Sequence, residues 1–131
     1  MAAIKINDNG DIFYIMPGGG QDPEELLTDA VIRECAEELG VVVTVKDLAF
    51  VVEGMHGESF HRVDLVFLCK YVSDIPKAQL HGDTNQVGVE WLTIDGLENQ
   101  PLYPSKLRKQ IINLYNSLPA DIYLGDESMG I

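Results

Sequence analysis

Three consecutive glycines, residues 18–20, follow a short apolar and aromatic run at residues 12–16, with only Pro17 between them. Turn-forming residues bound this run on both sides, which predicts a buried strand between two turns. Adjacent glycines cost backbone entropy on folding, so they are best explained where the chain approaches another group closely or exposes its amides and carbonyls. The glycines therefore predict a backbone-lined site immediately after the strand.

A helix is predicted to follow the glycines, over residues 23–39. Asp22 can cap it, Pro23 suits the first helical position, and Glu25 can reach back to the first turn. Apolar residues recur along this segment at steps of three and four, and Gly40 supplies a stop signal. The pattern thus predicts an amphipathic helix with one buried face.

The rest of the chain is predicted to form strands and one closing helix. Apolar and alternating runs predict strands at residues 41–45, 47–54, 60–71 and 87–94, and an amphipathic pattern predicts a helix at 105–118. Strands interleaved with two helices indicate an α/β protein whose mixed sheet is covered on both sides. Because 131 residues suffice for one core and not for two ordinary domains, we expect a single domain over residues 1–131.

The charge of the chain limits its partners. With 21 acidic and 9 scattered basic residues the net charge is −12, so nucleic acid is not an expected partner. An anionic small molecule would need a divalent cation as a mediator. No apolar run approaches the length of a membrane span and the first residues carry no export pattern, which predicts no membrane partner and a cytoplasmic location. Cys35 and Cys69 are expected to be buried thiols, not metal ligands.

Three glutamates gather near the end of the predicted helix. Residues three and four apart share a helix face, so Glu34, Glu37 and Glu38 present three carboxylates within about one turn. Such like-charge neighbours destabilise a helix, and the C-terminal end is unfavourable for acids. One interpretation is a solvated acidic face with an ion pair between Arg33 and Glu37. The nearby glycines favour another, a hard-cation site of oxygen ligands that suits Mg²⁺ or Mn²⁺.

The spacing of these residues resembles the Nudix box. With x for any residue, residues 19–41 have the pattern G-x5-E-x7-R-E-C-x-E-E-x-G-V. Every fixed Gly, Glu and Arg of the box is present, and Cys35 is the one soft departure. The resemblance implies a MutT-like Nudix hydrolase with an α/β/α sandwich, a mixed β-sheet between helices. Such an enzyme cleaves the diphosphate linkage of a nucleoside diphosphate derivative or a nucleoside triphosphate by water attack on phosphorus.

The resemblance also implies a metal site and a base. Glu34, Glu37 and Glu38 would bind Mg²⁺ or Mn²⁺ together with the carbonyl oxygen of Gly18. Either Glu37 or Glu38 would accept the proton of the attacking water, and the sequence does not decide between them. A further acidic group is usual in the loop before the strand that carries Trp; here the matching position holds Asn85, with Asp83 and Glu90 as its neighbours. Asp83 is the candidate, because Glu90 alternates with apolar residues and is expected to be an outward-facing strand residue.

Two more residues are implied to support catalysis, and three to contact substrate. Glu25 would pair with Arg33 and hold the glycine loop and the helix in register. Gly19, Gly20 and, to a lesser degree, Arg33 would contact the nucleotide. No accessory pattern selects a substrate branch, so nucleoside triphosphates and sugar nucleotides are equal candidates.

Two alternatives concern assembly and activity. The first residues, 1–6, either form a short first strand or leave a sheet edge that a second chain could cover, and the second case would give a homodimer. The alternative to an enzyme is a Nudix-like module that binds or senses a nucleotide without cleaving it.

Overall fold

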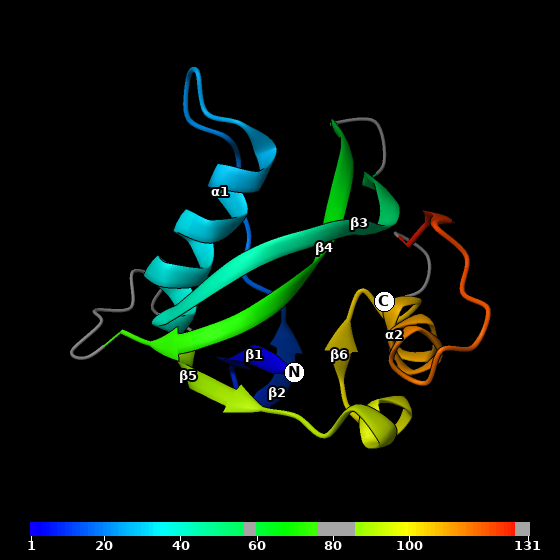
Figure 1. Cartoon of the computed structure of the whole chain (residues 1–131). Coiled ribbons are helices and arrows are strands. Elements are labelled where there is room, and N and C mark those ends of the chain that lie inside the picture. The colour runs from blue at the N-terminus through cyan, green and yellow to red at the C-terminus, as the bar shows by residue number, and fades with distance from the viewer. Residues whose placement is uncertain (57–59, 76–85, 128–131) are drawn as a thin grey trace.

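The computed structural model describes residues 1–56, 60–75 and 86–127. Within these ranges one sheet contains β1 (Ala2–Asp8), β2 (Asp11–Ile15), β5 (Gln86–Trp91) and β6 (Leu102–Tyr103), and another contains β3 (Val41–His56), β4 (Phe60–Asp74) and β7 (Tyr123–Asp126). The helices are α1 (Leu27–Glu34), its π-helical continuation (Cys35–Leu39), a 3-10 helix (Ile94–Asn99) and α2 (Leu107–Tyr115). Figure 1 shows α1 and α2 on opposite sides of the strands, which confirms the predicted α/β fold with helices on both flanks. Instead of the single mixed sheet that was predicted, the strands form two sheets, and each of them is mixed.

The first sheet has the strand order β5-β1-β2-β6. Strand β1 is antiparallel to both neighbours and pairs Ile4 with Ile15 on one side and with Val89 on the other. Strands β2 and β6 are parallel. The first residues therefore form an interior strand and not an exposed edge, so the homodimer hypothesis loses the support that it drew from such an edge.

The second sheet has the order β4-β3-β7. Two strands were predicted at residues 41–45 and 47–54, but both belong to the single strand β3. The register with β4 shifts between Val45 and Asp47 and again between Leu48 and Phe50, so extra residues are absorbed without ending the strand. Strand β7 pairs with β3 in parallel, with Tyr123 opposite Val51.

Helix α1 begins at Leu27, four residues later than predicted. Asp22 makes no side-chain cap to it; instead Glu25 accepts a hydrogen bond from the Asp22 amide at 3.0 Å, and Glu24 takes a positive φ of 65°. The start signal therefore closes a turn before the helix. The predicted strand at 87–94 ends at Trp91, and α2 is shorter at both ends than the predicted 105–118.

Apolar side chains from the strands and both helices form the core. The fully buried members are large residues such as Phe50, Ile4, Leu97, Leu102 and Leu107. Cys35 is buried as predicted, and burial raises the pKa of its thiol to about 11; Cys69 packs against it and is half-buried.

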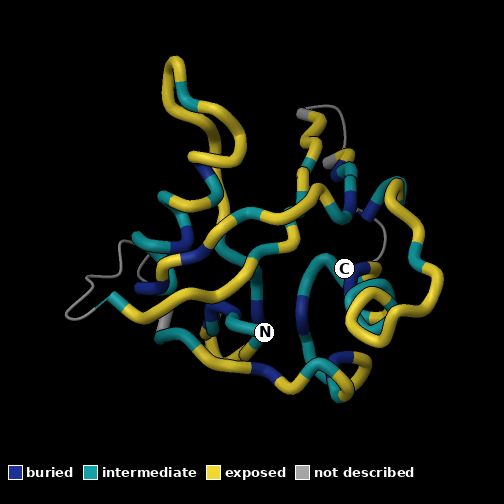
Figure 2. The backbone as a smooth tube through the Cα atoms, in the orientation of Figure 1, coloured by how far each residue is buried: buried dark blue, intermediate teal, exposed yellow. Residues whose placement is uncertain are grey.

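Figure 2 shows that the loop before α1 is exposed, in contrast to the buried segments of the strands. None of the helices in the described part of the chain is long and apolar enough to cross a membrane.

Candidate active site

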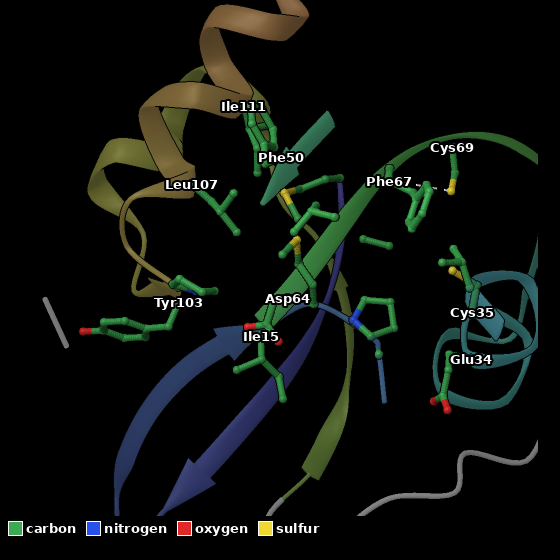
Figure 3. Close-up of a pocket in the computed structure, with 18 of the residues that line it drawn as sticks. Ile15, Glu34, Cys35, Phe50, Asp64, Phe67, Cys69, Tyr103, Leu107 and Ile111 are labelled. Carbon is green, nitrogen blue, oxygen red and sulfur yellow. Dashed lines mark hydrogen bonds between the residues drawn. The ribbon is translucent and has the colours of Figure 1, made fainter. Parts of the chain in front are cut away.

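A large cavity lies between the two sheets and extends to the glycine loop and both helices. Its volume is about 1740 Å³, larger than the roughly 300–1,000 Å³ of typical small-molecule sites. Figure 3 shows apolar walls from Ile15, Phe50, Leu107 and other residues, with Glu34 on one side. The cavity is large enough for a nucleotide that carries a further group.

Arg33 joins the glycine loop to the helix. Its Nε and Nη2 donate to the two carboxylate oxygens of Glu25, each at 2.9 Å, and Nη2 also donates to the carbonyl oxygen of Gly20 at 3.1 Å. The hydrogen bonds from Arg33, and after them the one from the Asp22 amide, lower the pKa of Glu25 to about 2, and Glu25 in turn raises the pKa of Arg33. The predicted pair between Glu25 and Arg33 is therefore present, and it holds loop and helix together.

The same guanidinium contacts two of the clustered glutamates. Arg33 Nη1 donates to Glu34 Oε1 at 2.9 Å and to Glu37 Oε2 at 3.4 Å. The Glu34 carboxylate also lies directly against Gly19, because a Cβ added there would be 2.9 Å from Glu34 Oε1. Gly19 thus permits a close approach that no other residue would allow without displacing the carboxylate.

Glu38 lies next to Glu34 and the backbone of Gly18. Burial raises the pKa of Glu38 to about 8, and the hydrogen bond and charge of Glu34 act in the same direction, while a backbone hydrogen bond from Gly18 opposes them. Two carboxyl groups are thus forced together beside the glycine loop. Such crowding is relieved when a cation binds between them.

The donor set fits a hard divalent cation. It consists of carboxylate and backbone oxygens, the ligands that Mg²⁺ and Mn²⁺ prefer. Within residues 1–56, 60–75 and 86–127, no three acidic, histidine or cysteine side chains already converge as the ligands of one ion. Arg33 holds Glu34 and Glu37 at present, so all three predicted ligands could act together only after side-chain adjustment.

Other predicted residues lie elsewhere or outside the described residues. Asp83 and Asn85 belong to the part of the chain that the structure does not describe. Glu90 accepts a hydrogen bond from the Tyr14 hydroxyl at 2.8 Å and lies 3.8 Å from Lys5 Nζ. Glu90 is therefore engaged within the first sheet.

Sequence reasoning missed several acidic groups at the cavity, among them Asp64 and Glu127. Asp64 lines it and pairs with Arg62; its position within the alternating pattern of β4 was the available signal. Glu127 is only 1% exposed and accepts hydrogen bonds from the amide and hydroxyl of Ser105 and from the Lys106 amide. It thereby fixes the start of α2, the helix that forms one wall, and no local pattern signals this contact.

Comparisons with known proteins agree with the geometry. A family model described as NUDIX domain matches residues 5–114. The "Uncharacterized Nudix hydrolase YvcI" of Bacillus subtilis (strain 168) is 25% identical over 92 residues, 70% of this chain and 58% of that protein. The chain therefore spans less than two thirds of the length of this curated relative.

Solved structures share the fold. A NUDIX hydrolase from Nitrosomonas europaea has a TM-score of 0.69 at 24% identity, covering 88% of this chain and 78% of the other. A UDP-X diphosphatase has a TM-score of 0.64 at 19% identity, covering 92% and 60%. An ADP-ribose pyrophosphatase from Streptococcus suis 89-1591 has a TM-score of 0.61 at 19% identity, covering 95% and 87%. Because the family model matches most of the chain, including the pattern at residues 19–41, the chain belongs to the Nudix family.

Proposed function

We propose that this protein is a Mg²⁺- or Mn²⁺-dependent hydrolase that cleaves the diphosphate linkage of a nucleoside diphosphate derivative or a nucleoside triphosphate. The observation that carries the proposal is the junction at Arg33, which holds the glycine loop against a cluster of glutamates at the edge of a large cavity. Family membership and two structural neighbours, one named as a UDP-X diphosphatase and the other as an ADP-ribose pyrophosphatase, support this reaction class.

Each residue of the cluster has a proposed task. Glu34, Glu37 and Glu38 would hold the cation, with the carbonyl oxygen of Gly18 as a further ligand. The bound cation would neutralise the diphosphate and make an attacking water more acidic. Glu37 and Glu38 are the two candidates for the group that accepts the proton of that water.

Glu25 and Arg33 would fix the position of the glycine loop and would not take part in the chemical step. Because the guanidinium bonds both oxygens of Glu25 and the carbonyl of Gly20, it fixes the loop relative to α1. A bidentate pair of this kind constrains orientation as well as distance. The backbone of Gly19 and Gly20 would then face the phosphates, whose charge the acidic protein could tolerate only with the cation present.

One pair of variants tests the proposal. Glu38→Gln removes a proposed ligand or base, while Asp29→Asn changes an exposed carboxylate on the same helix outside the cluster. With a nucleotide panel and Mg²⁺, we expect Glu38→Gln to lower kcat by about 10²-fold or more, the usual contribution of a general base. Asp29→Asn should keep wild-type activity, and both should keep the wild-type Tm. Wild-type rates from Glu38→Gln would contradict the assignment of the site.

A further inference from the structure

Two free thiols lie together behind the glutamate cluster. Cys35 begins the π-helical segment (Cys35–Leu39), and Cys69 lies on β4. Cys69 packs against the buried cluster that contains Cys35, Val41 and Val43, and the two thiols are close enough to interact electrostatically. Figure 3 shows the Cys69 side chain pointing from its strand toward Cys35. The pair therefore joins two elements that are distant in the sequence.

Cys35 directly adjoins the proposed metal ligands. Glu34 precedes it, and Glu37 and Glu38 follow within the same π-helical segment. Single π-helical turns are rare and are frequently found at functional sites. Cys35 is also the one soft departure from the box pattern at residues 19–41, so this thiol is a feature of this chain. A bond that fixes Cys35 to another element also fixes the backbone from which the three carboxylates extend.

The cavity gives a small oxidant access to the pair. Both cysteines line it; Cys35 is 8% exposed and Cys69 is half-buried. Cys69 is thus the thiol that a small oxidant from solvent reaches first. A disulfide holds its Cβ atoms about 3.5–4.5 Å apart. Such a bond would therefore set the separation between the π-helical segment and β4.

We infer that Cys35 and Cys69 form a reversible disulfide in the presence of a peroxide, and that this bond weakens metal binding by the adjacent glutamates. The inference goes beyond the proposed function and rests on it only for the metal site. Arg33 holds Glu34 and Glu37 at present, so the proposed ligands act together only after adjustment. A cross-link at Cys35 resists that adjustment because it ties the start of the segment to a strand.

The reaction balances with hydrogen peroxide as the oxidant. The Cys69 thiolate attacks one peroxide oxygen and the O–O bond breaks; the departing hydroxide takes a proton and leaves as water, which gives a sulfenic acid at Cys69. The Cys35 sulfur then attacks the Cys69 sulfur, and the S–O bond breaks with loss of a second water that carries the Cys35 proton. Two thiols and one peroxide thus give one disulfide and two waters. Burial raises the pKa of both thiols, which slows the first step, so the reaction is followed over hours.

Mass spectrometry and calorimetry test the two parts of the inference. After treatment with hydrogen peroxide, the intact mass and peptide mapping show whether Cys35 and Cys69 are linked. Isothermal titration calorimetry measures Mn²⁺ binding before oxidation, after oxidation, and after reduction with dithiothreitol. We expect the linked form to bind Mn²⁺ about tenfold more weakly, the lower end of the effect of groups that orient metal ligands. Reduction should restore the affinity.

Variants separate the disulfide from other oxidation. Cys69→Ala removes the half-buried thiol, and Cys35→Ala removes its partner; both should keep their Mn²⁺ affinity under peroxide. Met55→Leu removes an exposed methionine that peroxide also oxidises, and this variant should lose affinity as the wild type does. No link, a linked form with unchanged Mn²⁺ affinity, or an equal loss of affinity in Cys69→Ala would overturn the inference.

The outcomes also separate this inference from the proposed function. Absence of the link would leave the proposed function standing. Absence of Mn²⁺ binding by the reduced protein would refute the proposed metal site and, with it, the effect of the link on binding.

Discussion

A methyl group at Gly19 should disturb the glutamate cluster specifically. A Cβ there would lie 2.9 Å from Glu34 Oε1, whereas ordinary van der Waals contact begins at 3.4 Å, so the carboxylate must move by 3.4 − 2.9 = 0.5 Å. Arg33 Nη1 holds the same oxygen at 2.9 Å, which prevents a free rotation away. A displacement of about 1 Å in a catalytic arrangement can cost about 10²-fold in rate. Half that displacement predicts a loss of about tenfold in kcat/KM for Gly19→Ala.

The assay compares the activity of Gly19→Ala with that of alanine variants at glycines where the added Cβ would contact no other atom. An added Cβ meets nothing within 4 Å at Gly20, in the same loop, or at Gly96, in the 3-10 helix. Gly20→Ala should therefore lose less activity than Gly19→Ala, and Gly96→Ala should lose none. Calorimetry with Mg²⁺ alone should show weaker binding only for Gly19→Ala. Equal losses at residues 19 and 20, or wild-type metal affinity in Gly19→Ala, would refute the reasoning.

Two further predictions concern stability. The pKa of Glu25 is lowered to about 2 from 4.5, so its stabilising effect is complete above pH 4.5 and is lost as the pH falls toward 2; Glu25→Gln should lower Tm at pH 6, and this difference from wild type should shrink between pH 4.5 and 2. A difference that grows in acid would contradict it. Leu107→Ala should lower the free energy of unfolding by about 2–5 kcal/mol in urea denaturation because Leu107 is fully buried. Leu118→Ala, on a residue 54% exposed, should change it by less than about 0.5 kcal/mol.

The resemblance to the Nudix box predicted one part of the site. It implied that Glu25 pairs with Arg33, and the structure has both hydrogen bonds. The predicted start of the helix was wrong because Glu25, which was expected to support an N-terminal cap, instead closes a turn with Asp22 and binds Arg33. A capping pattern in the sequence contains no information on whether another side chain competes for the same carboxylate.

Features that depend on long-range pairing could not be predicted. The division into two sheets follows from which strands pair across the chain, and strand patterns contain little information on this. The inward position of Asp64 depends on its register against Val52. The contact of Glu127 with Ser105 joins residues 22 positions apart, and neither residue has a local pattern that points to the other.

Product analysis tests the central claim most directly. The purified protein is incubated with ADP-ribose, UDP-sugars and nucleoside triphosphates, with Mg²⁺, Mn²⁺ or EDTA, and nucleoside monophosphate, pyrophosphate and phosphate are measured. We predict release of a nucleoside monophosphate from at least one substrate with Mg²⁺ or Mn²⁺, and none with EDTA. Nucleotide binding without any cleavage under these conditions would contradict the claim and indicate a module that senses nucleotides.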